Sequence, residues 1–133
     1  SQPPLRTAAA IRRSEMGQRK ILVVEDDALI AMELSERLAD LGYEVIGPAH
    51  SIAEAEQLIA ATKPDAALLD ANLAGASSVP LGMTLNGMGV PVAFCTGYDR
   101  IKDLPAALNS APLLTKPVPD AELVNALKGL VGA

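Results

Sequence analysis

The sequence contains few aromatic residues and almost no cysteine. Among its 133 residues there are no tryptophans, one phenylalanine, two tyrosines and one cysteine. Binding of single-stranded nucleic acid needs aromatic platforms in a basic groove, and a chain with three aromatic rings and a formal net charge of −5 offers neither. We therefore expect no direct nucleic-acid partner. The single Cys95 has no disulfide partner within the chain, which favours a reducing compartment.

Long apolar runs are absent from the sequence as well. No stretch approaches the ~20 apolar residues of a membrane span, and the run Ala8–Ile11 is too short for the ~7–15-residue core of a signal peptide. We therefore expect a cytoplasmic protein that does not bind a membrane. A chain of 133 residues can bury a core without disulfides or a structural metal, and it is expected to form a single domain.

Charge is distributed unevenly along the chain. Residues 1–20 contain five basic groups and one acidic group, whereas residues 21–133 contain six basic and fifteen acidic groups, a formal charge of −9. The first segment is expected to be a basic leader, either a tail or a short helix at about 4–15. Such a helix would dock Leu5 and Ile11 on this molecule or on a neighbouring copy in a homodimer.

We divide the chain into this leader, residues 1–19, and one domain over residues 20–131, in which apolar runs alternate with helical patterns. Strands are expected at 20–24, 43–46, 65–70, 90–95 and 112–115. The first helix is expected to end at Gly42, and further helices are expected at 51–62, 78–88, 101–109 (interrupted by Pro105) and 119–131. A loop is expected at 71–76. This alternation is typical of α/β domains with parallel strands joined by right-handed crossovers. In such sheets the ligand site lies beyond the carboxyl ends of the strands.

Several residues of the domain are expected to have structural roles. The apolar residues of the first helix are expected to cover the sheet and to lie in the core: Leu29, Ile30, Leu34, Leu38 and Leu41. Asp27 is expected to cap that helix, and Ser51 is expected to form a capping box with Glu54. His50 is expected to be a surface residue, and Cys95 a buried small hydrophobe.

Polar residues follow four of the five expected strands. They are Glu25 and Asp26 after the first strand, Asp70 at the end of the third, Thr96 after the fourth, and Lys116 with Pro117 after the fifth. Because parallel strands end at one edge of a sheet, these side chains are expected to converge. Carboxylates ~4 Å apart repel by ~4 kcal/mol per pair at an effective dielectric of about 20, so either one is protonated or a divalent cation neutralises them. Ligands that are all oxygen favour Mg²⁺.

These residue types suit phosphoryl transfer to a carboxylate. Asp70 is the candidate nucleophile because it ends a buried strand alone, whereas Glu25 and Asp26 form a pair suited to holding a metal ion directly or through water. Thr96 can donate a hydroxyl hydrogen bond to a phosphoryl oxygen, and Lys116 supplies a positive charge. The sequence therefore predicts a metal-dependent phosphoryl site.

The order of these residues resembles that of response regulator receiver domains of the chemotaxis-receiver type. The resemblance covers about residues 20–131 and rests on these motifs: Glu25-Asp26-Asp27, Asp70 with Asn72, Thr96-Gly97 and Lys116-Pro117. It implies a flavodoxin-like (βα)5 domain whose parallel sheet has the strand order 2-1-3-4-5. It also implies a cis peptide bond before Pro117.

The resemblance further implies a signalling role in a two-component system. Asp70 would accept a phosphoryl group from a histidine kinase or a histidine phosphotransfer protein, and the change would pass to a downstream protein. Mg²⁺ would be held by Glu25, Asp26, Asp70 and the backbone carbonyl of Asn72. Such a domain is a switch more than an enzyme, because it assists only its own phosphorylation and dephosphorylation.

The chain departs from the usual receiver pattern near its fourth and fifth strands. Residues 91–98 are similar to a subgroup with the motif Pro-Phe-x-Phe-Ala-Thr-Gly-Tyr, but Val92 and Cys95 replace the first phenylalanine and the alanine. Usual receivers carry an aromatic residue three positions before the lysine, where this chain has Leu113. We therefore expect the switch to involve Tyr98 and the segment after it, in place of the usual coupling between Thr96 and that aromatic.

Three other functions are compatible with parts of the pattern. A phosphohydrolase with an aspartyl nucleophile would normally carry a second acid two residues later, where this chain has Asn72. A flavodoxin-like nucleotide or flavin binder would need a loop rich in glycine or hydroxyl groups after the first strand, whereas Glu25, Asp26 and Asp27 repel phosphate in the absence of metal. A receiver-like interaction module that is never phosphorylated is the third alternative, and the sequence does not exclude it.

Overall fold

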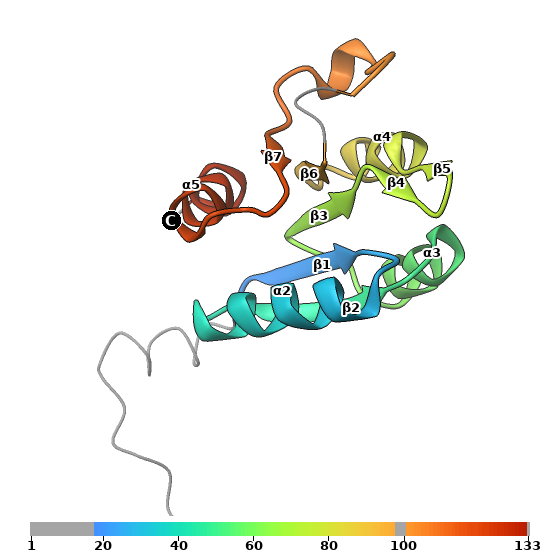
Figure 1. The fold of residues 1–133 in the computed structure, drawn as a ribbon. Helices are drawn as coiled ribbons and strands as arrows, with labels where there is room; N and C mark the ends of the chain where they lie inside the picture. The colour runs from blue at the N-terminus through green and yellow to red at the C-terminus, as the bar shows by residue number, and fades with distance from the viewer. Residues whose placement is uncertain (1–17, 98–100, 133) are drawn as a thin grey trace, which may run out of the picture.

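The computed structural model describes residues 18–97 and 101–132, in which strands and helices alternate around one five-stranded sheet (Figure 1). The strands of the sheet are β1 (Lys20–Val24), β2 (Glu44–Ala49), β3 (Ala66–Asp70), β6 (Val92–Thr96) and β7 (Leu113–Thr115); β4 (Asn72–Leu73) and β5 (Ala76–Ser77) form a separate hairpin. The helices are α2 (Ala28–Asp40), α3 (Ile52–Ala61), α4 (Val79–Gly87) and α5 (Asp120–Val131), with a 3-10 turn η1 (Ala106–Leu108).

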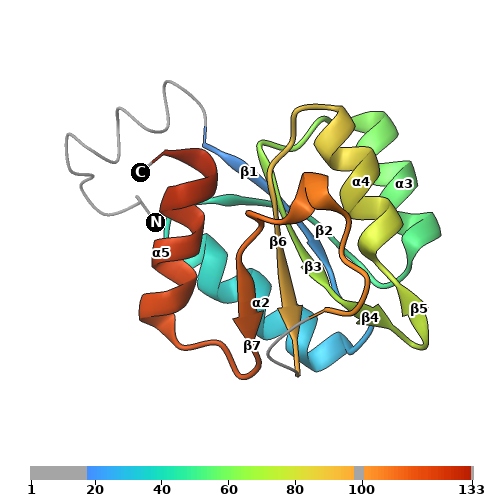
Figure 2. The ribbon, with the colours of Figure 1, turned by 90° about the horizontal axis from the view of Figure 1, so that it is seen from above.

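The sheet has the order β2-β1-β3-β6-β7 and all of its strand pairs are parallel, which confirms the predicted topology. Helices α2 and α5 cover one face, and α3 and α4 cover the other (Figures 1 and 2). Strand β3 is buried along its whole length and β1 from its second residue onward, as continuous apolar runs require. The carboxyl ends of β1 and β3 therefore meet in the middle of one sheet edge.

The first helix exposes residues that were expected in the core. Leu29 is 73% exposed, Ile30 41% and Leu41 40%, so the prediction was wrong for these three residues. The stripe that faces the sheet contains Leu38 and Ala31, both fully buried. Ala31 packs against the sheet, and the larger residues beside it face outward. A prediction based on large apolar residues alone does not identify Ala31 as a core residue.

The helix caps follow the sequence closely. The side chain of Asp27 accepts hydrogen bonds from the N–H groups of Leu29 and Ile30, which confirms it as the N-cap of α2. Ser51 caps α3 by accepting from the N–H of Glu54. The predicted capping box is only half formed, because the carboxylate of Glu54 accepts from the N–H of His50 at 3.3 Å.

Strand β2 extends beyond its predicted end at residue 46 and runs through Gly47 and Pro48 to Ala49. Because β2 lies at the edge of the sheet, a proline in it removes no interior ladder bond. The Gly47–Pro48 peptide is cis and Gly47 has φ of 99°. A Cβ atom at Gly47 would lie 2.6 Å from the backbone nitrogen of Ala49, so this conformation requires glycine.

The fourth crossover contains no α-helix among its described residues. The helix expected at 101–109 is wrong: only η1 forms, beginning after Pro105, and Asp103 has φ of 58°. Proline lacks the N–H that a helix interior needs and disfavours helical geometry in the residue before it. The alternation of strand and α-helix is therefore complete for four of the five units.

Other boundaries differ by a few residues from those expected. The loop at 71–76 contains β4 and part of β5, β6 begins two residues later than predicted, and Pro119 is the N-cap of α5 instead of its first residue. The leader helix at about 4–15 and Tyr98 lie outside the described residues. None of the helices in the described ranges is long and apolar enough to cross a membrane.

Candidate functional site

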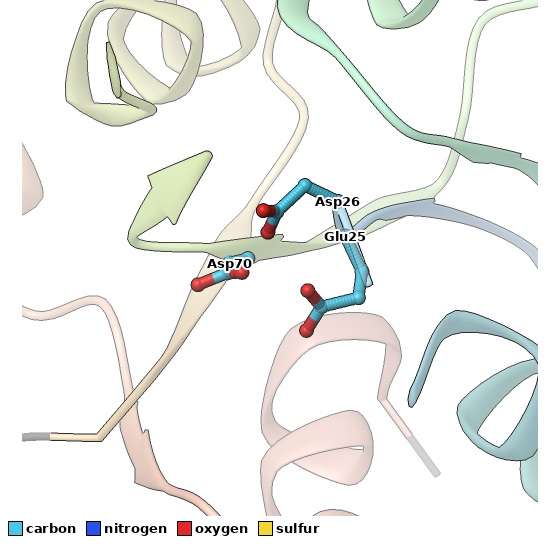
Figure 3. A group of neighbouring side chains, drawn as sticks. All are labelled: Glu25, Asp26 and Asp70. Atoms are coloured by element: carbon cyan, nitrogen blue, oxygen red, sulfur yellow. The ribbon is translucent and has the colours of Figure 1, made fainter. Parts of the chain in front are cut away.

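The ends of β1 and β3 bring three carboxylates together (Figure 3). Glu25 and Asp26 follow β1, and Asp70 is the last residue of β3. One oxygen from each of these residues lies within 4.8 Å of the others. Glu25 and Asp70 are buried, with 3% and 7% exposure, whereas Asp26 is exposed at the mouth of the site. The predicted convergence of these acids is present in the structure.

Lys116 lies between two of the carboxylates. Its Nζ is 2.5 Å from Oε1 of Glu25 and 3.2 Å from Oδ2 of Asp70. The second oxygen of Glu25 accepts from the N–H of Asp27 at 3.0 Å, and Oδ1 of Asp70 accepts from the N–H of Asn72 at 3.2 Å. Both oxygens of Glu25 are thus already engaged within the protein.

The segment after β7 places Lys116 in the site. The N–H of Lys116 donates to the carbonyl of Thr96 at 2.8 Å, and the peptide before Pro117 is cis, as the resemblance implied. Thr96 ends β6 opposite Thr115 and is 5% exposed. The residues predicted at the ends of β6 and β7 therefore lie at the same sheet edge as the acids.

Asn72 begins the β4–β5 hairpin two residues after Asp70. Its side-chain oxygen accepts from the N–H of Gly75 at 2.7 Å and holds the hairpin turn. This contact leaves the side chain occupied away from the carboxylates, and the role expected for Asn72 concerns its backbone carbonyl alone.

The three carboxylates perturb one another's ionisation. Burial, reinforced by Glu25 and Asp26, raises the pKa of Asp70 to about 7. The hydrogen bond with Asp70 lowers the pKa of Asp26, so the two neighbouring acids are shifted in opposite directions. Burial alone would lower the pKa of Lys116, but its hydrogen bond to Glu25 and the charge of Asp70 outweigh burial and raise it.

The donor set fits a hard divalent cation. All three side chains offer carboxylate oxygens, the ligands that Mg²⁺ prefers. Three carboxylates and one ammonium group give the site an excess of negative charge. A divalent cation would neutralise this excess. Without a cation, the raised pKa of Asp70 reduces it, because part of Asp70 stays protonated near neutral pH.

His50 touches the site, and no pattern in the sequence indicated this contact. The residue is exposed, as expected, yet its Nδ1 lies 3.0 Å from the backbone carbonyl of Glu25. The N–H of Glu25 also donates to the carbonyl of Ala49 at 2.9 Å. The pairing of Ala49 with Val24 at the end of β1 produces this contact, and it was missed because β2 was predicted to end too early.

The remaining switch candidates lie beside the acids or outside the described residues. Leu113 is half-buried on β7 and pairs with Phe94, so an aliphatic side chain fills this position. Tyr98 belongs to the part of the chain that is not described. Cys95 is 6% exposed, and burial raises the pKa of its thiol to about 12, which matches the role of a small core residue.

Comparison with known proteins places the chain beside bacterial regulatory proteins. A family model described as response regulator receiver domain matches residues 21–128. The chain is 27% identical over 113 residues to the transcriptional regulatory protein PdtaR of Mycobacterium tuberculosis, covering 83% of this chain and 55% of that protein. It is 39% identical over 82 residues to the phyllosphere-induced regulator PhyR of Methylorubrum extorquens, covering 59% of this chain and 31% of that protein. The chain spans about half or less of the length of these curated relatives.

Solved structures agree with this comparison. The receiver domain of PhyR from Erythrobacter litoralis superposes with a TM-score of 0.76 at 30% identity, covering 88% of this chain and 92% of that chain. SdrG from Sphingomonas melonis superposes with a TM-score of 0.72 at 33% identity, covering 86% of this chain and 97% of that chain.

Proposed function

Because the chain belongs to the response regulator receiver family, whose members are signalling domains, we propose that it accepts a phosphoryl group on the carboxylate of Asp70. The donor is a histidine kinase or a histidine phosphotransfer protein, and the phosphorylated state changes the binding of a downstream protein. The observation that carries the proposal is the position of Asp70 at the end of a buried strand, 3.2 Å from Lys116 and within 4.8 Å of two further acids.

Transfer to Asp70 is a displacement at phosphorus. The P–N bond of a phosphohistidine breaks while a bond forms between phosphorus and a carboxylate oxygen of Asp70, and the departing imidazole takes up a proton. Asp70 must be ionised to attack, and its pKa of about 7 means that it is only partly ionised near neutral pH without a metal ion. Lys116 offers a positive charge to the incoming phosphoryl oxygens, and Thr96 offers a hydroxyl hydrogen bond.

Receiver domains bind Mg²⁺ through acidic residues, and the acids of this chain fit that ion. Asp26 and Asp70 would hold it directly, together with the backbone carbonyl of Asn72. Glu25 would act through water, because Lys116 and the N–H of Asp27 already occupy its two oxygens. When bound, Mg²⁺ neutralises charge on the carboxylate and on the phosphoryl oxygens.

Phosphorylation of Asp70 is tested by incubating the whole chain with acetyl phosphate and Mg²⁺ and measuring its intact mass. We expect a gain of one phosphoryl group that is lost in Asp70→Asn and abolished by EDTA. Asp40→Asn, which removes an exposed carboxylate at the end of α2, is the matched control and keeps the gain. A wild-type chain that gains no mass, or an Asp70→Asn chain that still does, overturns the proposal in favour of an interaction module or another acceptor.

The route of the switch is a separate part of the proposal. Leu113 offers no aromatic ring to turn inward toward Thr96, so we assign the response to Tyr98 and the fourth crossover. Hydrogen exchange with and without a phosphate mimic measures it, and changes in protection are expected within residues 97–111. A response confined to other segments, such as α2 or α3, overturns this assignment.

A further inference from the structure

The strand β2 ends beside the acidic site, where it and the residue after it hold the backbone of Glu25. The carbonyl of Ala49 accepts from the N–H of Glu25 at 2.9 Å. Nδ1 of His50 lies 3.0 Å from the carbonyl oxygen of Glu25. Because a carbonyl oxygen only accepts hydrogen bonds, Nδ1 of His50 carries a proton and is the donor. Both backbone polar groups of Glu25 are therefore engaged by the end of β2.

A bulge in β2 brings His50 to this position. Ile46 of β2 pairs with Leu22 of β1. Three residues later, Ala49 pairs with Val24, which is only two residues further along β1, so β2 contains one extra residue. In a continuous register His50 would lie one position further along the sheet edge. Bulges beside functional sites are known to re-aim a side chain in this way.

The hydrogen bond from His50 restrains the peptide that leads into Asp26. The carbonyl of Glu25 and the N–H of Asp26 belong to one planar unit, so a donor on that carbonyl limits rotation of the whole unit. On its other side Asp26 is followed by Asp27, which is fixed as the N-cap of α2. Asp26 is thus an exposed residue between two neighbours that are both held by hydrogen bonds.

Asp26 depends on this support more than the other two acids do. Glu25 and Asp70 are buried, and both contact the ammonium group of Lys116. Asp26 is exposed at the mouth of the site, where its carboxylate faces Asp70 (Figure 3). An exposed side chain keeps more rotamer freedom than a buried one. The direction of its backbone therefore has a larger share in keeping the carboxylate of Asp26 near Asp70.

We propose that His50 is a positioning residue for the phosphoacceptor site. It holds the peptide between Glu25 and Asp26 so that the carboxylate of Asp26 stays directed at Asp70 and is placed to bind a divalent cation. Both the neutral Nδ1–H tautomer and the imidazolium ion donate this hydrogen bond, so the role does not depend on the charge of His50. The consequence for phosphorylation rests on the proposed function, whereas the hydrogen bond and cation binding are measurable without phosphoryl transfer.

The hydrogen bond is tested by NMR spectroscopy of the imidazole nitrogens in the metal-free full chain. The chain contains one histidine, so the signals need no further assignment. The hydrogen bond made by one ring nitrogen decides which nitrogen carries the proton in neutral imidazole. We therefore expect the Nδ1–H tautomer in alkaline buffer, because Nδ1 faces the carbonyl of Glu25. An Nε2–H tautomer overturns the proposal.

Cation affinity is tested by titrating the wild type, His50→Leu and His50→Asn with Mg²⁺ and following the amide signals. His50→Leu has an apolar side chain without a donor. Its Kd is expected to rise about 3–10-fold, the effect of one hydrogen bond that supports a metal ligand. His50→Asn places an amide N–H near the position of Nδ1 and should restore most of the affinity. An unchanged Kd in His50→Leu overturns the proposal, and so does an equal loss in His50→Asn, which would assign the effect to another part of the ring.

Met32→Leu is the matched control for the same surface. Met32 lines the surface pocket to which His50 also belongs, but its thioether cannot donate a hydrogen bond. Its substitution should leave the Kd for Mg²⁺ unchanged, and an equal rise in Met32→Leu overturns a specific role for His50. Because His50 is exposed, His50→Leu is expected to fold, which urea denaturation in EDTA verifies.

Acetyl phosphate separates a positioning role from a direct one. In His50→Leu the Mg²⁺ concentration that gives half-maximal labelling of Asp70 should rise by the same factor as Kd, while the rate at saturating Mg²⁺ stays at the wild-type value. A lower rate at saturating Mg²⁺ would place His50 in the chemical step and overturn the positioning role.

The same experiment distinguishes this proposal from the proposed function. If His50→Leu binds Mg²⁺ more weakly but no chain gains a phosphoryl group, the positioning role stands and the proposed function fails. If the wild type is phosphorylated but His50→Leu has an unchanged Kd, the proposed function stands and the positioning role fails.

Discussion

Replacing Asp70 by asparagine should make the metal-free protein more stable above neutral pH. The substitution keeps the shape of the side chain and removes one of three carboxylates that lie within 4.8 Å of one another. It leaves Lys116 paired with Glu25 at 2.5 Å. The expected gain in the free energy of unfolding arises because the substitution removes a buried charge and its repulsion by Glu25 and Asp26, and it should appear only where Asp70 is ionised.

The size of the gain follows from the charges. Repulsion between unit charges at 4.8 Å, the outer limit of the cluster, is ~3.5 kcal/mol per pair at an effective dielectric of about 20. Attraction to Lys116 at 3.2 Å is ~5 kcal/mol on the same basis. Two repulsions from Glu25 and Asp26 against this one attraction leave a net repulsion of about 2 kcal/mol on an ionised Asp70.

The pH dependence has a definite sign. The pKa of Asp70 is raised from 3.8 to about 7 in the folded protein, so between these values the folded state binds more protons than the unfolded state. The free energy of unfolding of the wild type therefore falls as pH rises through this window, and the loss is complete above about pH 7. The amide introduced by Asp70→Asn does not titrate, so the difference in the free energy of unfolding between variant and wild type should be small near pH 4. Near pH 8 it should reach about 2 kcal/mol from repulsion alone and up to about 4 kcal/mol if the whole pKa shift is expressed, at ~1.4 kcal/mol per pKa unit.

Urea denaturation in EDTA at both pH values measures this difference. Asp40→Asn serves as the matched control and should show no such pH-dependent difference. Adding Mg²⁺ at the higher pH should stabilise the wild type more than Asp70→Asn and narrow the gap between them. The reasoning is refuted if Asp70→Asn is less stable than the wild type in EDTA near pH 8. It is also refuted if the difference in the free energy of unfolding is the same at both pH values.

Three other substitutions or treatments probe neighbouring features. Gly82→Ala should destabilise the fold by about 1–3 kcal/mol, because its Cβ would lie 2.9 Å from Cζ of buried Phe94, whereas Gly87→Ala on the same helix has no atom within 4 Å and should be neutral or slightly stabilising in urea denaturation. Lys116→Gln should lower the free energy of unfolding near pH 8 by about 1–3 kcal/mol, since it leaves buried Glu25 without its cation, and an unchanged denaturation midpoint would contradict the pairing. Cys95 should resist iodoacetamide in the folded state and react after denaturation, because its thiol is buried with a pKa of about 12; rapid native alkylation, seen by intact mass, would contradict this burial.

The acidic site was predictable because it depends on strand ends, which the sequence marks clearly. Continuous apolar runs identify β1 and β3, and each is followed or ended by a carboxylate. Parallel topology then brings Glu25, Asp26 and Asp70 to one edge without knowledge of any other contact. Lys116 and Thr96 follow by the same argument, since they end or follow the next strands of the sheet.

The buried face of α2 was harder to predict than the acidic site, because the prediction from periodicity used only large apolar residues and left out alanine. The series Ile30, Leu34 and Leu38 suggested one buried stripe, but Ala31 takes the position closest to the sheet. Similarly, the extension of β2 through Pro48 depends on its place at the sheet edge, which is a property of the assembled fold. The contact of His50 with Glu25 depends in turn on that extension.

The short 3-10 turn in the fourth crossover has a consequence for how free energy can be transmitted. The other three crossovers contain α-helices of 13, 10 and 9 residues, whereas η1 has three. A segment with few internal hydrogen bonds opens for a smaller free energy than the protein as a whole. The proposed phosphorylation at the sheet edge would supply only a few kcal/mol. Such a free energy can shift the conformations of the fourth crossover while the crossovers that contain α-helices stay folded. Among the described residues this crossover has the shortest helical segment, so we expect it to respond before the other three.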